Sequence, residues 1–101
     1  MVEFKQETKE SVEILCCTFV GRLDTEECNK DGKLVEAQLK IIKSSIVFDL
    51  EKVEYVSSAF LRICIQAVKC VGKDKFSIVK VPPFVMKVLK IAGLDSMLTI
   101  S

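Results

Sequence analysis

Ser57 and Ser58 carry the side chains best placed for chemistry in this sequence. An apolar run at residues 46–50, typical of a buried strand, leads through a polar bend to the two serines, and an apolar helical pattern follows at once. The first N–H groups of a helix have no partner inside it, and the helix dipole favours negative charge at that end. A phosphate on one of these hydroxyls would be stabilised there, although an ordinary N-cap serine has the same sequence signature.

The sequence offers little else for catalysis. It has no histidine, so the commonest general base is missing and a nucleophilic triad is disfavoured. Asp24 and Asp49 could be imagined as an acid–base pair, but no metal-ligand spacing or glycine-rich phosphate loop accompanies them. We therefore predict a protein that is not an enzyme and that uses no cofactor or metal.

Length and composition indicate one compact domain over residues 1–101, because 50% of the residues are hydrophobic. The 15 basic and 14 acidic residues are spread along the chain, whereas nucleic-acid binding needs clustered Lys and Arg. No apolar run is long enough to cross a membrane, so no membrane insertion is expected. Of the 5 cysteines, all but Cys28 lie in apolar runs. They are expected to be small buried side chains in a reducing compartment, which favours a cytoplasmic protein.

Hydrophobic periodicity predicts elements in the order β-β-α-β-α-β-α-β. The strands are expected at residues 2–8, 11–23, 46–50, 76–81 and 97–100, and the helices at residues 25–42, 58–71 and 83–92. Parallel pairing is expected wherever a helix connects two strands. The fold class is therefore α/β, with a mixed, mostly parallel sheet of about five strands packed with three or more helices.

The first predicted helix has a clear start and a weak first half. Asp24 and Glu27 have the spacing of a capping box, in which the aspartate accepts a backbone hydrogen bond and the glutamate reaches back to the N-cap. Gly32 lies in a turn-like Asn-Lys-Asp-Gly sequence and costs about 1 kcal/mol inside a helix. We expect one helix that is frayed at its beginning.

Four segments in this order resemble the STAS domain, the fold of anti-sigma factor antagonists and of the cytosolic tails of sulfate transporters. They are Gly-Arg-Leu-Asp at 21–24, the strand region 47–56, Ser-Ser-Ala-Phe-Leu-Arg at 57–62, and Ile-Ala-Gly-Leu at 91–94. The resemblance covers nearly the whole chain. It implies a regulatory module that binds an anti-sigma factor, is phosphorylated by that serine-protein kinase, and is restored by a phosphatase.

Alignment on Leu61 places the family's phosphoacceptor at Ser58, with Ser57 as the alternative. The resemblance also implies that Asp24 lies near the phosphoserine and the partner-binding surface. We expect this surface to comprise Asp24, Ser57, Ser58, Phe60 and Arg62. Arg62 lies about one helical turn after Ser58, where a guanidinium can reach a phosphate. Two positions depart from the family pattern, since Ser57 replaces an aspartate and Phe60 replaces a glycine. A phenylalanine here could obstruct the docking of a kinase or could be an apolar contact for a different partner, and we favour the contact.

These departures also favour an alternative function. The chain would then be a STAS scaffold domain of a larger signalling or transporter complex, binding through the same helix face without phosphorylation.

Overall fold

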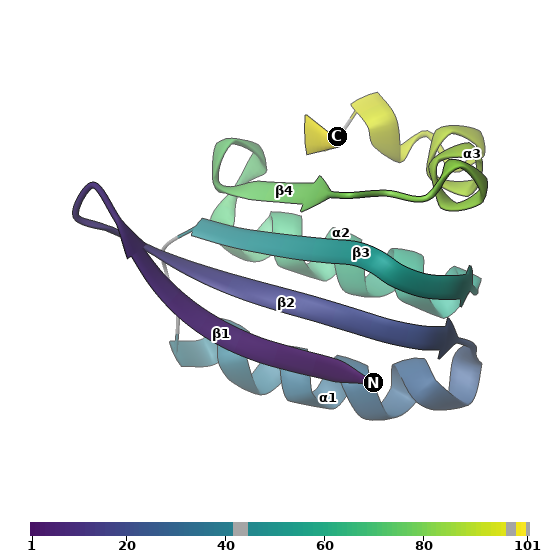
Figure 1. Cartoon of the computed structure of the whole chain (residues 1–101), viewed down its shortest axis with the longest axis horizontal. Coiled ribbons are helices and arrows are strands. Elements are labelled where there is room, and N and C mark those ends of the chain that lie inside the picture. Colours follow the sequence, from purple (N-terminus) through teal and green to yellow (C-terminus); the bar gives the residue numbers. More distant parts are fainter. Residues whose placement is uncertain (42–44, 97–98, 101) are drawn as a thin grey trace.

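The computed structural model describes residues 1–41, 45–96 and 99–100. Within these ranges a five-stranded sheet has the order β1-β2-β3-β4-β5. β1 (Val2–Lys9) and β2 (Val12–Leu23) form an antiparallel hairpin, and β3 (Ser45–Val56), β4 (Phe76–Val79) and β5 (Thr99–Ile100) extend the sheet in parallel. The predicted α/β class, element order and mixed, mostly parallel sheet are confirmed (Figure 1).

Three α-helices in the described part of the chain connect the parallel strands: α1 (Thr25–Ile41), α2 (Ser58–Val71) and α3 (Pro83–Ile91). α1 and α2 pack against each other behind the sheet, while α3 contacts the 3₁₀ turn Leu94–Ser96 that precedes β5 (Figure 1). In such an arrangement the carboxyl ends of the parallel strands meet at one edge of the sheet. The β2–α1 and β3–α2 junctions therefore lie close together, and a hydrogen bond from Ser57 N–H to the Leu23 carbonyl joins them at 2.9 Å.

The core lies between the sheet and the two helices behind it. Phe19 of β2 and Phe48 of β3 are fully buried, because alternate residues of each strand point to this face. Their ring centroids are 4.9 Å apart in an edge-to-face arrangement. Phe60 of α2 completes the contact, with its ring 5.1 Å from that of Phe19. Such edge-to-face aromatic pairs contribute about 0.5–1.5 kcal/mol beyond the apolar area that they bury.

The prediction that Phe60 is a partner contact is therefore wrong. Its side chain is 0% exposed, because this position of α2 faces the sheet while Ser58 faces solvent. The phenylalanine that replaces the family's glycine fills the core. It neither obstructs nor anchors anything at the surface.

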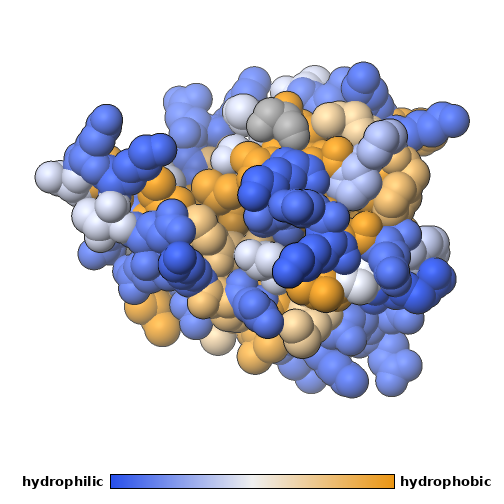
Figure 2. All heavy atoms as spheres, in the orientation of Figure 1, coloured by the Kyte–Doolittle hydropathy of each residue, from blue (hydrophilic) through white to orange (hydrophobic). Residues whose placement is uncertain are grey.

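The opposite face of the sheet, turned toward the viewer in Figures 1 and 2, has no helix over it in the described part of the chain. Figure 2 shows hydrophobic residues interspersed with hydrophilic ones on this side. Half-buried side chains such as Cys16, Val47 and Ser77 occupy the outward strand positions. This burial pattern is typical of a sheet with one packed face and one solvated face.

Several predicted boundaries differ from the structure. β3 runs to Val56 with no polar bend, since it pairs with the long β2 through two register shifts, between Thr18 and Val20 and between Gly21 and Arg22. α1 is continuous through Gly32, because α2 packs against it and stabilises the helix there. The last strand is described only at residues 99–100. Positions 42 and 97–98 of the predicted elements lie outside the described residues.

The expectation for the cysteines is correct for Cys17 and Cys64, which are buried, but wrong for Cys70, which is exposed. Cys28, the one cysteine outside an apolar run, is buried because it lies on the inner side of α1, among the residues that face the core. None of the cysteines is in a disulfide in the structure.

Candidate functional site

The candidate site is the junction where β3 ends and α2 begins. Ser57 occupies the N-cap position with extended backbone angles, φ −105° and ψ 172°, and its carbonyl accepts a hydrogen bond from Phe60 N–H at 3.1 Å. Its hydroxyl makes no capping hydrogen bond to the helix. Ser58 is the first helical residue and is exposed. Of the two serines that could be the N-cap, Ser57 therefore takes that position and Ser58 does not.

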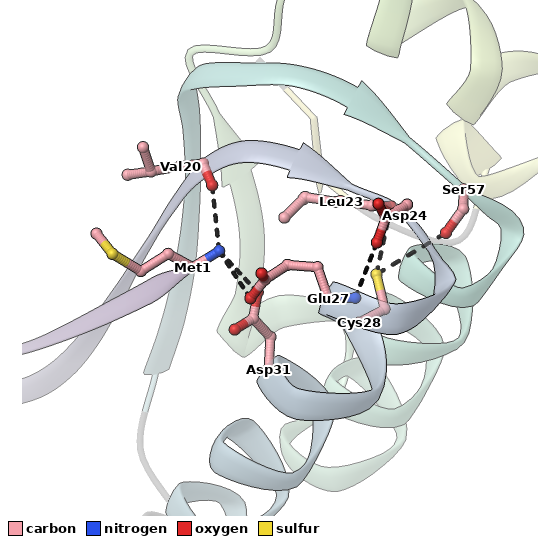
Figure 3. A network of polar contacts seen from close by, with 8 residues as sticks. All are labelled: Met1, Val20, Leu23, Asp24, Glu27, Cys28, Asp31 and Ser57. Atoms are coloured by element: carbon pink, nitrogen blue, oxygen red, sulfur yellow. Dashed lines mark hydrogen bonds and ion pairs between the residues drawn. The ribbon is translucent and has the colours of Figure 1, made fainter.

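The Ser57 hydroxyl faces α1 instead of the start of α2. Ser57 Oγ lies 3.9 Å from Cys28 Sγ (Figure 3). The Cys28 thiol donates to the Leu23 carbonyl at 3.5 Å, so the serine hydroxyl is the donor to sulfur. Burial raises the pKa of the Cys28 thiol, and the Ser57 hydroxyl partly offsets that effect. Cys28 is therefore a neutral thiol, and the half-buried Ser57 hydroxyl points toward it.

Asp24 caps α1 at the neighbouring junction. Its Oδ1 accepts a hydrogen bond from Glu27 N–H at 2.9 Å, which is the predicted first half of the capping box. The predicted second half is wrong, because the Glu27 carboxylate turns to the Met1 amino group, at 3.0 Å. Asp24 is exposed, so its free oxygen faces solvent at the same edge of the sheet as Ser58.

A buried carboxyl group lies one turn further along α1. Asp31 is 2% exposed, and its Oδ2 lies 3.2 Å from the Met1 amino nitrogen in an ionic contact (Figure 3). Burial raises the pKa of Asp31, although the amino group pulls it down in part. The hydrogen bond to that amino group lowers the pKa of Glu27. The two carboxyl groups thus differ in the ease with which they lose a proton.

Arg22 and Tyr55 form a second exposed contact at this edge. They are paired in the register of β2 and β3, and the guanidinium carbon of Arg22 lies 4.6 Å from the centroid of the Tyr55 ring. Arginine and tyrosine are frequent in the energetically important part of protein interfaces. A cavity of about 450 Å³ beside this pair is lined by Arg22, Asp24 and Lys30, among other residues.

A groove runs between α1 and α2 and begins beside the serines. Its cavity has a volume of about 390 Å³. The α1 wall includes Gly32 and Lys33, and the α2 wall includes Ala59, Arg62 and Ile63. Arg62 thus lies on the groove and one turn after Ser58 on the same helix. Asp24 lines the other cavity and not this groove.

Asp49 does not pair with Asp24 in the described contacts. Its Oδ1 accepts a hydrogen bond from Glu51 N–H at 3.0 Å, and its Oδ2 lies 3.7 Å from Lys80 Nζ. Asp24 has its own partner at the start of α1. The imagined acid–base pair is therefore not formed by the described contacts.

The structure thus brings Asp24, Ser57 and Ser58 to one edge, places Arg62 one turn along α2, and buries Phe60. Sequence reasoning missed Cys28 and the groove residues Gly32 and Lys33. For Gly32 a signal was present, since a glycine costs stability inside a helix, but it was interpreted as fraying at the beginning of the helix. For Cys28 the signal was its position four residues after the N-cap Asp24, on the inner side of α1.

Within the described residues, no helix is both long and apolar enough to cross a lipid bilayer. A comparison with curated proteins gives no significant match.

Three solved structures have a similar fold. A Thermotoga maritima protein, proposed as an anti-sigma factor antagonist, has a TM-score of 0.81 and 21% identity, covering 96% of this chain and 84% of that one. An anti-sigma factor antagonist from Mycobacterium paratuberculosis has a TM-score of 0.77 and 20% identity, covering 99% and 85%. The phosphorylated form of SpoIIAA, a Bacillus cell fate determinant, has a TM-score of 0.68 and 14% identity, covering 98% and 91%.

At these identities the solved structures establish the fold alone. The family is established by the sequence itself, because a model of the STAS domain matches residues 5–101, nearly the full length. Together with the five-stranded sheet and its helices, this match shows that the chain belongs to the STAS domain family.

Proposed function

We propose that this chain is a regulatory binding module that acts as an anti-sigma factor antagonist and is switched by phosphorylation at Ser58. The observation that carries the proposal is the exposed Ser58 hydroxyl at the first position of α2. The fold relatives support it, since they are anti-sigma factor antagonists and one of them is a phosphorylated form. The partners are an anti-sigma factor that is a serine kinase and a phosphatase that reverses the modification.

The phosphorylation chemistry requires only an accessible hydroxyl from this chain. Ser58 Oγ forms a bond to the γ-phosphorus of ATP while the bond from that phosphorus to the β,γ-bridging oxygen breaks and ADP leaves. The hydroxyl proton goes to a base of the kinase. The phosphatase reverses the state by hydrolysis, in which water supplies the oxygen of the released inorganic phosphate and Ser58 recovers its proton.

The phosphate would change the surface by charge. It adds about 1.5 to 2 negative charges next to α2's first N–H groups, which accommodate an anion well. The modified chain therefore keeps its fold but presents a different electrostatic surface to the partner. Asp24, whose carboxylate faces solvent at the same edge, contributes to the surface that the partner contacts.

Ser58 is a better acceptor than Ser57 for a structural reason. Ser58 is exposed, whereas Ser57 is half-buried and its oxygen lies 3.9 Å from the buried Cys28 sulfur. A kinase would have to break the Ser57–Cys28 contact and place a phosphate beside a buried thiol. This cost favours Ser58, although the two serines are adjacent in sequence.

The test is phosphorylation by the kinase-type anti-sigma factor of the same organism, with ATP, followed by intact mass measurement and fragmentation to locate the phosphate. The wild type, Ser58→Ala and Ser57→Ala are compared. We expect one phosphate in the wild type and in Ser57→Ala, and none in Ser58→Ala.

Binding to the same anti-sigma factor is then measured by calorimetry. Ser58→Asp should weaken the affinity, whereas Ser58→Ala should retain it. Binding that is unaffected by Ser58→Asp, with no phosphate on either serine, would support the STAS scaffold instead. Absence of binding altogether would exclude the antagonist function.

A further inference from the structure

We infer that the groove between α1 and α2 is the docking site for a segment of the anti-sigma factor that carries an apolar side chain next to a carboxylate. Arg62 pairs with that carboxylate, and a phosphate on Ser58 draws Arg62 away from the groove. This inference rests on the proposed function. It goes beyond that function because it names where the partner docks and how phosphorylation of Ser58 weakens that docking.

The groove is continuous with the switch. Its upper end is formed by Cys28 and Ala59, which are next to the two serines in space or sequence. Ala59, Arg62 and Gln66 follow at helical spacing along the α2 wall. A partner that contacts Ser58 can therefore extend along the groove without leaving the surface of this chain.

The floor and rim indicate the chemistry of the occupant. The buried Ile63 and the small Ala59 give the floor an apolar character. Two cationic side chains, Lys33 and Arg62, rise beside one anionic side chain, Glu36. None of the three is in an ion pair among the described residues. An apolar side chain for the floor and a carboxylate for the two cations are the complement of this surface.

Gly32 gives an independent reason to assign a function to the groove. It lies inside α1, where a glycine destabilises a helix by about 1 kcal/mol relative to alanine. A Cβ at this position would meet Ile63 side-chain carbons at 3.6 Å, which is ordinary contact. The fold thus does not require glycine here. A glycine does leave room for the close approach of a partner's backbone or side chain along the α1 wall.

Arg62 links the groove to the serine. It stands four residues after Ser58, so the two side chains are neighbours on the helix surface. With Ser58 unmodified, Arg62 lines the groove, and its guanidinium can pair with the carboxylate of the partner. A phosphate on Ser58 offers a stronger, charge-assisted partner within reach. The phosphate then competes for Arg62, and the groove loses one of its two cations.

The first test needs no partner protein. Phosphoserine is placed at position 58 of the full chain by genetic encoding, and its second ionisation is followed by ³¹P NMR. Pairing with Arg62 stabilises the dianion, so Arg62→Gln should raise the midpoint by about 0.2–0.4 pH unit. The matched control is Lys69→Gln, an exposed change further along α2. Equal midpoints in the wild type and Arg62→Gln would overturn the role given to Arg62.

The second test is a double-mutant cycle of Ser58→Asp and Arg62→Gln, with affinity for the purified anti-sigma factor measured by calorimetry. Arg62→Gln and Lys33→Gln should each weaken binding about 5-fold or more, and Lys69→Gln should not. The loss caused by Ser58→Asp should shrink by a factor of about 2 or more in the Arg62→Gln background.

The outcomes separate the two proposals. If Ser58→Asp leaves wild-type affinity unchanged, the proposed switch fails. If Ser58→Asp weakens binding but its effect adds to that of Arg62→Gln without coupling, the switch stands and the inference about Arg62 is overturned. If the Lys33 and Arg62 variants bind like the wild type, the groove is not the docking site.

Discussion

Ser57 Oγ lies 3.9 Å from Cys28 Sγ, so the serine at the N-cap position of α2 directs its hydroxyl to the neighbouring helix. This contact connects the two junctions that carry the candidate site. It also leaves the first N–H groups of α2 without a side-chain cap from Ser57. The adjacent exposed hydroxyl of Ser58 is therefore at a helix end that can still accept an anion.

The two junctions should respond differently to loss of their side-chain oxygens. Asp24→Ala removes the hydrogen bond from Glu27 N–H and should lower the free energy of unfolding by about 0.5–2 kcal/mol. Ser57→Ala removes only a weak contact with sulfur and should cost less than about 0.5 kcal/mol. Urea denaturation measures both. Asp24→Asn is the matched control, because its amide oxygen can still cap the helix, and an equal loss in that variant would argue against capping.

Phe60 should behave as a core residue. Phe60→Ala removes a fully buried ring that packs on Phe19 and Phe48, and should lower the free energy of unfolding by about 3–5 kcal/mol. This is a large share of the total stability of a small domain, so Phe60→Leu is the companion variant and should cost less. Denaturation curves give the values. A Phe60→Leu variant that is as stable as the wild type but binds the anti-sigma factor more weakly would show that Phe60 contributes to partner binding.

The sequence was sufficient to predict the order of the elements, because apolar periodicity and turn residues are local signals, and the family, because four short segments in order resemble the STAS domain. The sequence was insufficient to predict which residues in the first turn of α2 face the sheet and which face solvent. Whether Phe60 or Ser58 faces the sheet depends on how α2 packs, and the aromatic neighbours Phe19 and Phe48 come from distant segments.

The same reason explains the misread first half of α1. Gly32 weakens an isolated helix, but the packing of α1 against α2 maintains the helix through this position. The groove between the two helices is a tertiary feature that has no pattern in either segment alone. Asp24, by contrast, was predicted as a cap because its hydrogen bond to Glu27 N–H is local.

Asp31 should make stability decline with pH over a defined window. Burial raises its pKa above the ordinary value of 3.8, so the native state binds this proton more tightly than the unfolded chain does. Stability then falls as the pH rises from about 3.8 to the raised native pKa. Glu27 has the opposite sign, since its lowered pKa gives stability that is lost as the pH falls below its ordinary value of 4.5.

Asp31→Asn isolates the first effect because an amide does not ionise. Urea unfolding of the wild type and the variant is measured at several pH values between about 4 and 7. The free energy of unfolding of the variant should rise relative to that of the wild type as the pH increases. A constant offset is also expected from replacing the buried carboxyl group by an amide beside the Met1 amino group, whose nitrogen lies 3.2 Å from Asp31 Oδ2. Two parallel stability profiles would contradict the raised pKa.

Gly32→Ala should stabilise the chain. The new methyl group meets Ile63 side-chain carbons at 3.6 Å, without a clash, and alanine is favoured over glycine in a helix by about 1 kcal/mol. Gly72→Ala is a control with the opposite expected sign. Gly72 ends α2 at φ +91°, where any side chain is strained, so the substitution should lower the free energy of unfolding by about 1 kcal/mol or more. Thermal and urea denaturation measure both changes. A destabilised Gly32→Ala variant would mean that close helix packing requires the glycine, whereas a stabilised variant with weakened affinity for the anti-sigma factor would mean that the groove requires it.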